Sequence, residues 1–268
     1  MTAPMTPLLP VALEAAALAR DLILTRAPGT VTAKGDRDMA SEVDYAVERA
    51  VRDHLRERTP AIGFLGEEEG RTGPAESGLT WIADPVDGTA NFVHGIPLCG
   101  FSLGLAHHDD PVLGVIDLPF LGARYSAAQG AGAYLGDRRI RASTATSLSD
   151  AVVAIGDYAV GPGADNGRRL ALTGLLSAHV QRIRMLGSAA LDLAWTAEGR
   201  LDASLTLSNN PWDMAAGAAI AREAGADLHD AHGAPYNLAS DSIIVTAPGL
   251  TTAFRELLAE AMTVHRSP

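Results

Sequence analysis

The segment 81–89 carries the residues best suited to chemistry, because an apolar run there ends in Asp84-Pro-Val-Asp87-Gly-Thr89. This spacing brings two carboxylates and a hydroxyl to one turn. Hard cations such as Mg²⁺ select oxygen ligands and keep several waters, so a few carboxylates and the phosphate oxygens of a substrate can hold two ions. Gly88 permits close backbone approach, and free amides at a helix start after it can receive a phosphate oxygen. The segment therefore favours metal and phosphate binding at one place.

Two further acidic segments fit the same chemistry. Glu67 follows an apolar stretch at residues 61–66, and Asp213 begins a predicted helix in Trp212-Asp-Met-Ala-Ala-Gly217. Taken singly, an Asp at a helix start is more often a cap, and a run of Glu is more often solvated surface. Their occurrence together with Asp84 and Asp87 favours a metal site.

Apolar periodicity predicts the elements that position these side chains. Residues 9–26 and 41–58 have helical spacing, and Asp44 lies in the early turns of the second helix. The short apolar stretches 61–66 and 79–83 are typical of strands. We expect these strands to deliver Glu67 and Asp84 at their C-terminal ends.

The rest of the chain changes rhythm near residue 143. Residues 101–140 contain β-rich runs separated by turn residues, which predicts an antiparallel meander. Strands then alternate with helices, which is typical of an α/β arrangement. The strands are expected at 152–155, 182–185, 202–207 and 242–246, and the helices at 168–179, 188–198, 213–224 and up to about 264. We therefore expect an N-terminal α+β lobe at 1–145, with most of the metal ligands, and a C-terminal α/β lobe at 146–268, with Asp213 and the substrate pocket.

Composition argues against several classes of function. A chain of 268 residues with 47% hydrophobic content can bury a substantial core, and a net charge of -11 disfavours binding to nucleic acid or an anionic membrane through a basic surface. The single cysteine, Cys99, lies in an apolar run, so no disulfide can form within the chain and a buried, inert thiol is expected. No apolar run approaches the length of a membrane span, which favours a cytoplasmic protein.

Over nearly its whole length the chain resembles the inositol monophosphatase family, within the lithium-sensitive, fructose-1,6-bisphosphatase-like phosphatases. The resemblance rests on Gly66-Glu-Glu68, Asp84-Pro-Val-Asp87-Gly-Thr89 with Asn91-Phe92, and Trp212-Asp-Met-Ala-Ala-Gly217. Supporting segments are Lys34-Gly35, Glu42-Val-Asp44, Gly130-Ala-Gly-Ala-Tyr134 and Gly187-Ser-Ala-Ala190. It implies a layered αβαβα sandwich, hydrolysis of a small phosphorylated metabolite with two or three Mg²⁺ ions, and a homodimer. It also implies inhibition by Li⁺ and by excess Ca²⁺.

The resemblance further implies a role for each residue that matches a family motif. Glu67, Asp84 and the Val86 carbonyl would bind one metal, and Asp84, Asp87 and Asp213 a second. Asp44 would help to hold water around a third ion, and Thr89 would orient the attacking water with Glu67 or Asp44. The substrate would be bound by a set of residues on both sides of the metals, namely Gly88, Thr89, Gly187, Ser188, Ala189, Thr206 and Asp213.

The sequence leaves several alternatives open. A haloacid-dehalogenase-type site needs two acids two residues apart, whereas Asp84 and Asp87 are three apart, and an EF-hand lacks its glycine and closing Glu here. A catalytically silent relative that binds metal or a phosphorylated ligand is the alternative from another class. Inositol-specific relatives carry a Glu where this chain has Thr206, so histidinol phosphate, sugar phosphates and 3′-phosphoadenosine 5′-phosphate are alternatives to inositol phosphate.

Overall fold

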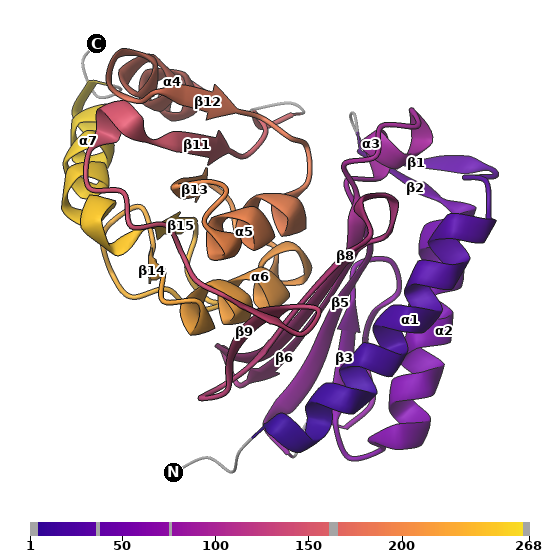
Figure 1. Ribbon diagram of the computed structural model, residues 1–268. Coiled ribbons are helices and arrows are strands. Elements are labelled where there is room, and N and C mark those ends of the chain that lie inside the picture. Colours follow the sequence, from indigo (N-terminus) through magenta and orange to yellow (C-terminus); the bar gives the residue numbers. More distant parts are fainter. Residues whose placement is uncertain (1–4, 36–37, 75–76, 161–165, 265–268) are drawn as a thin grey trace.

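The chain forms alternating layers of helices and sheets in the order helix pair, sheet, helix pair, sheet, helix pair (Figure 1). The computed structural model describes residues 5–35, 38–74, 77–160 and 166–264. A larger, eight-stranded sheet lies in the N-terminal part and a five-stranded sheet in the C-terminal part. The layered αβαβα arrangement predicted from the sequence is confirmed.

Helices α1 (Leu9–Thr25) and α2 (Glu42–Arg58) cover one face of the large sheet. A hairpin of β1 (Val31–Gly35) and β2 (Asp38–Ser41), which the sequence did not predict, connects them. On α2 every fourth residue of an apolar stripe is buried in the core that the two helices share with the sheet: Val43, Val47, Val51 and Leu55. This packing fixes the start of α2, where Asp44 lies.

The eight strands of the large sheet have the spatial order β10-β9-β8-β7-β6-β5-β3-β4. Strands β6 to β10 pair consecutively and antiparallel, which confirms the predicted meander. Strands β3 and β5 are parallel, with Gly66 beside Ala83, so Glu67 and Asp84 follow at the same edge. The strands are β3 (Gly63–Gly66), β4 (Gly70–Thr72), β5 (Leu79–Asp87), β6 (Gly100–His107), β7 (Asp110–Leu118), β8 (Ala123–Ala128), β9 (Gly132–Leu135) and β10 (Arg138–Ile140).

The second sheet is mixed and has the order β12-β11-β13-β15-β14. Strand β11 is parallel to β12 and β13, whereas β15 is antiparallel to β13 and β14. Its strands are β11 (Val152–Ile155), β12 (Arg182–Arg184), β13 (Ala203–Thr206), β14 (Asp227–His229) and β15 (Ile243–Thr246). Successive side chains of β15 point to opposite faces of this sheet. Ile243 and Val245 pack in the core that contains the helices at 189–198 and 211–223, and Ile244 packs in the core that contains those at 167–179 and 251–264.

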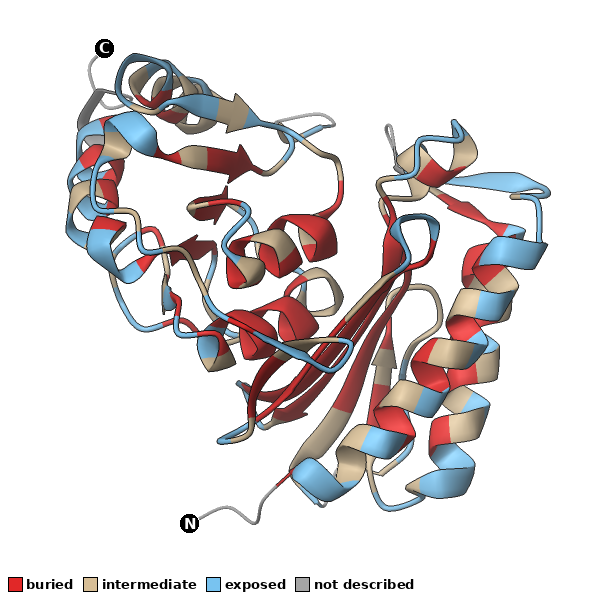
Figure 2. Cartoon of the chain, in the orientation of Figure 1, coloured by how far each residue is buried: buried red, intermediate tan, exposed pale blue. Residues whose placement is uncertain are grey.

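The remaining helices separate and cover the sheets, and two glycines on the large sheet set the position of one of them. They are α3 (Thr89–Val93), α4 (Gly167–His179), α5 (Ala189–Glu198), α6 (Pro211–Glu223) and α7 (Thr251–Val264). Buried surfaces of α5 and α6 face both sheets (Figure 2). A Cβ atom on Gly104 would lie 2.6 Å from the Cβ atom of Ala215, and one on Gly114 would collide with the Ala216 backbone. Glycine therefore allows α6 to lie directly on β6 and β7, which brings its first turn to the end of β5.

None of the helices in the described part of the chain has both the length and the apolar composition needed to cross a bilayer.

Candidate active site

A bulge at the end of β5 places Asp84 and Asp87 on the same side of the strand. In regular strand geometry residues three apart point to opposite faces. Here Asp84 pairs with Ser102 and Asp87 with Gly100, so three steps along β5 match two along β6. The backbone amide of Val86 donates to Asp84 Oδ1 at 3.0 Å, which holds that carboxylate across the bulge. The sequence predicted that these acids converge, and the bulge is the reason.

Asp213 joins them from the first turn of α6. One carboxylate oxygen from each of Asp84, Asp87 and Asp213 lies within 4.8 Å of the others. Burial is the main cause that raises the pKa of each acid, and the charges of neighbouring carboxylates raise it further. The pKa is about 6 for Asp87 and about 8 for Asp213, and that of Asp84 lies well above its ordinary value. Because each carboxylate disfavours the charged form of the other two, a positive charge placed between them would be stabilised.

Glu67 lines the same cavity but lies outside this group of three. Its Oε1 accepts a hydrogen bond from Lys34 Nζ at 2.5 Å, and the same ammonium donates to Glu68 Oε1 at 3.0 Å. Its charge still raises the pKa of Asp84, Asp87 and Asp213. Glu67 therefore belongs to the same electrostatic centre, with a lysine ion pair that sequence reasoning did not predict.

Thr89 and Asp44 form a second polar group next to the bulge. Thr89 Oγ1 lies 3.0 Å from Asp44 Oδ1 and 3.0 Å from the Val86 carbonyl oxygen, either of which can accept its proton. Asp44 is fully buried in the capping box of α2, where its Oδ2 accepts from the Ser41 amide at 2.9 Å. Burial raises the pKa of Asp44, although these hydrogen bonds favour its charged form. The structure thus brings Thr89, Asp44 and Val86 together, as expected.

The other wall of the site is the start of α5. Asp87 accepts hydrogen bonds from the Ser188 hydroxyl, from the Ala190 amide at 2.8 Å and from the Ala189 amide at 3.3 Å. A negative charge is stabilised at a helix N-terminus by the free amides and the helix dipole. Gly88 has φ 84° and lies against this wall, where an added Cβ would be 3.0 Å from the Gly187 carbonyl oxygen. Only glycine fits there without strain.

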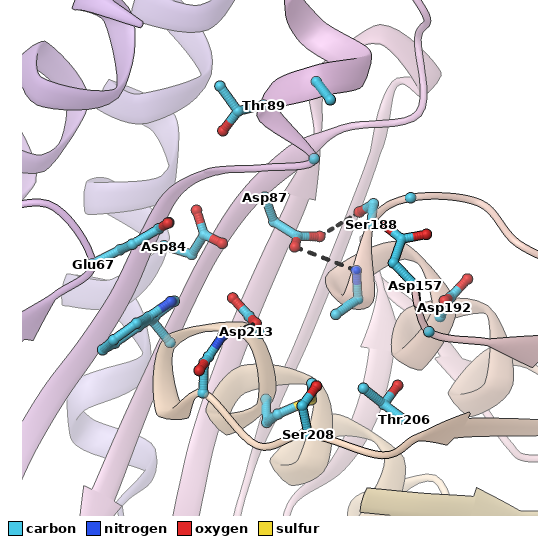
Figure 3. A pocket seen from close by; sticks show the side chains of 18 of the residues that line it. Glu67, Asp84, Asp87, Thr89, Asp157, Ser188, Asp192, Thr206, Ser208 and Asp213 are labelled. Carbon is cyan, nitrogen blue, oxygen red and sulfur yellow. Dashed lines mark hydrogen bonds between the residues drawn. The ribbon is translucent and has the colours of Figure 1, made fainter. Parts of the chain in front are cut away.

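All these residues surround one cavity of about 690 Å³ (Figure 3). Of the residues predicted to bind metal or substrate, all line the cavity: Glu67, Asp84, Val86, Asp87, Gly88, Thr89, Gly187, Ser188, Ala189, Thr206 and Asp213. Asp44 reaches the site through Thr89. Sequence reasoning missed four charged residues of the wall, namely Lys34, Asp157, Arg169 and Asp192. Lys34 lies in the segment Lys34-Gly35, which supports the family resemblance, but no spacing pattern in the sequence marks the other three.

The donor set of the cavity fits hard divalent cations. The converging groups are the carboxylate oxygens of Asp84, Asp87 and Asp213, with the Val86 carbonyl oxygen beside them. This group of three acids, within the described part of the chain, includes neither His nor Cys. Mg²⁺ and similar ions prefer such oxygen ligands. The mutual repulsion of the acids would be relieved by a bound cation, so residues and ion are compatible.

Comparisons with known proteins agree on one family. The family model described as "Inositol monophosphatase family" matches residues 5–266. A curated relative, the inositol-1-monophosphatase of Rhizobium meliloti, is 39% identical over 228 residues, which cover 85% of each protein. The fructose-1,6-bisphosphatase/inositol-1-monophosphatase of Thermotoga maritima is 37% identical over 211 residues, or 78% of each protein. Among solved structures, the extragenic suppressor protein suhB from Bartonella henselae superimposes with a TM-score of 0.88 at 33% identity, covering 94% of this chain and 98% of that chain.

Proposed function

Because the chain belongs to the inositol monophosphatase family, we propose that it hydrolyses inositol monophosphate, or a similar polyol phosphate, with Mg²⁺ held by its carboxylate cluster. Membership of this family makes the chain a phosphoric monoester hydrolase. The observation that carries the proposal is the approach of Asp84, Asp87 and Asp213 to within 4.8 Å inside a cavity that also contains a helix N-terminus. Without a cation this arrangement of acids would repel a phosphate group.

The proposed metal ligands follow the positions of the acids around the cavity. Glu67, Asp84 and the Val86 carbonyl would hold one ion, and Asp84, Asp87 and Asp213 a second; water bound to Asp44 would contact a third. When bound, Mg²⁺ supplies positive charge that makes water more acidic and offsets the charge that develops on phosphate and leaving oxygen.

The chain's own residues would position water and substrate. The Thr89 hydroxyl, which already contacts Asp44, would orient the attacking water, with Glu67 or Asp44 taking its proton. The amides of Gly88 and Thr89 would bind phosphate oxygens. The leaving group would lie against a wall formed by Gly187, Ser188, Ala189, Thr206 and Asp213. No covalent intermediate is needed, because water can attack the phosphorus in line.

The names of the relatives support inositol phosphate as the first substrate to assay. Thr206, which replaces a Glu of inositol-specific relatives, lines the cavity and is buried. Histidinol phosphate, sugar phosphates and 3′-phosphoadenosine 5′-phosphate therefore remain alternatives. One relative also carries fructose-1,6-bisphosphatase in its name.

Phosphate release from a panel of these monoesters, with Mg²⁺ and with EDTA, tests the proposal. We expect Mg²⁺-dependent turnover that Asp87→Asn and Asp213→Asn each abolish in a folded protein, whereas Asp137→Asn, in an exposed turn, has no effect. A folded wild-type protein that binds Mg²⁺ but releases no phosphate from any ester would instead be a silent, ligand-binding relative.

We propose three further properties with the same enzyme. Li⁺ and excess Ca²⁺ should inhibit it, since each would compete for the Mg²⁺ site; inhibition by neither would count against that site. It should be a cytoplasmic homodimer, which sedimentation and fractionation can check. The division into lobes at residues 1–145 and 146–268 stays a prediction, which limited proteolysis can test.

A further inference from the structure

One carboxylate of the cavity has no role in the site described above. Asp192 lies on α5, four residues after Ser188 and therefore on the same helix face, one turn further along the helix. It lines the cavity, is only 3% exposed, and its Oδ1 has no hydrogen-bond partner among the described residues. A buried polar oxygen without a partner is costly, which makes it unusual in a folded protein.

Asp157 adds a second acid to the same end of the cavity. It lies just after β11, is exposed, and is close enough for its charge to act on Asp192. Figure 3 shows both side chains on the opposite side of Asp87 from Glu67 and Asp84. The proposed metal ligands thus lie toward one end of the cavity, and Asp157 and Asp192 lie toward the other, with Asp87 between them.

No protein cation within the described ranges is paired with these two acids. Arg169 lines the cavity nearby, but its guanidinium donates to the Leu207 carbonyl at 2.8 Å. Burial is the main cause that raises the pKa of Asp192, and the charges of Asp87 and Asp157 raise it further. A ligand that brings hydrogen-bond donors, charged or neutral, would stabilise this end of the cavity.

We infer that Asp192, with Asp157 at the rim, binds the hydrogen-bond donors of the leaving alcohol and so selects among phosphate monoesters. The inference rests on the proposed phosphatase function. Hydrogen-bond donors or a positive charge on the bound alcohol would favour the ionised form of Asp192, against the burial that raises its pKa. An ionised carboxylate only accepts hydrogen bonds, so it favours alcohols that carry hydroxyl or ammonium groups over plain aryl or alkyl alcohols. Asp192 would supply from α5 the carboxylate contact that Thr206 cannot make from β13.

The test compares three esters in Asp192→Asn, Asp157→Asn and the exposed control Asp137→Asn. The esters are myo-inositol 1-phosphate, with neutral donors; histidinol phosphate, with an ammonium group; and p-nitrophenyl phosphate, whose leaving group has no donor. Asp192→Asn should lower kcat/KM for one or both donor-bearing esters by about tenfold or more, because a charge-assisted hydrogen bond is lost. The loss on p-nitrophenyl phosphate should stay below about threefold. Asp157→Asn should have a smaller effect of the same kind, since its side chain is exposed to solvent.

The pattern of losses identifies the donor. A larger loss on histidinol phosphate indicates an ammonium ligand, and a larger or equal loss on inositol phosphate indicates hydroxyls. Equal losses on all three esters, or no loss on any, would overturn the inference.

Two readouts do not depend on turnover. Calorimetric binding of free myo-inositol or histidinol, with Mg²⁺ and inorganic phosphate present, should weaken by a similar factor in Asp192→Asn. If the wild-type enzyme hydrolyses no ester, the proposed function fails, and this binding measurement alone then decides the inference.

The melting temperature of Asp192→Asn should equal or exceed that of the wild type, because an unpaired buried carboxylate is removed. A lower melting temperature would show that Asp192 is structural and contradict the inference.

Discussion

The clustered acids make the stability of the metal-free protein depend on pH, and Asp213→Asn tests that dependence. Burial and the charges of Asp87 and Glu67 raise the pKa of Asp213 from its ordinary 3.8 to about 8. Between these values the folded protein keeps a proton that the unfolded chain has released. The free energy of unfolding therefore falls as pH rises through this window, and the loss is complete above it.

The size of the effect follows from the shift. A pKa difference of about four units corresponds to at most about 6 kcal/mol, at about 1.4 kcal/mol per unit. Asp213 is partly exposed, and carboxylate oxygens of Asp84 and Asp87 lie within 4.8 Å of one of its own, so the three protonation equilibria influence one another and we expect about 2–4 kcal/mol. An amide has no charge to bury, so Asp213→Asn should remove this penalty and be the more stable protein at about pH 9 without metal.

Urea unfolding in EDTA at about pH 5 and about pH 9, followed by tryptophan fluorescence, measures this difference. The variant should exceed the wild type at the higher pH, and the difference should shrink at the lower pH. Saturating Mg²⁺ should reverse the order, because only the wild type has the complete ligand set. Asp137→Asn should behave as the wild type throughout. A variant no more stable than the wild type at the higher pH would refute the electrostatic account of the cluster.

Three other predictions concern single side chains. Thr89→Val should lower kcat by about 100-fold, because the hydroxyl beside Asp44 is lost, and Thr89→Ser should keep most of the activity; equal kinetics for both would rule out an orienting role. Ser188→Ala should lower the free energy of unfolding by about 1 kcal/mol in thermal or urea melts, since Ser188 caps α5 and donates to Asp87; an unchanged midpoint would contradict this. Cys99, fully buried and with its pKa raised to about 12 by burial, should react with a thiol reagent no faster than the protein opens; rapid labelling of native protein would be the opposite result.

Much of the fold follows from local patterns in the sequence. The stripe of Val43, Val47 and Val51 predicts the buried face of α2, and turn residues between β-rich runs predict the meander. Acidic residues at strand ends predicted that Glu67 and Asp84 would be neighbours, which the parallel pairing of β3 and β5 explains. These features depend on periodicity and short-range chemistry.

Other features depend on contacts between distant segments and have no local signal. The bulge that turns Asp84 and Asp87 to one side arises from pairing with β6, and the Lys34–Glu67 ion pair requires the hairpin before α2 to lie over the cavity. Asp192 looks like an ordinary acid in the first turn of a helix. Only the position of α5 against the second sheet shows that it lines the cavity.

The most direct test of the account is anomalous diffraction from crystals of the protein soaked in Mn²⁺, an ion that accepts the same oxygen ligands as Mg²⁺. We predict anomalous peaks between Asp84, Asp87 and Asp213, and between Asp84 and Glu67 with the Lys34 contact displaced. An active enzyme whose crystals bind Mn²⁺ elsewhere, and show no peak among these carboxylates, would contradict the proposed site.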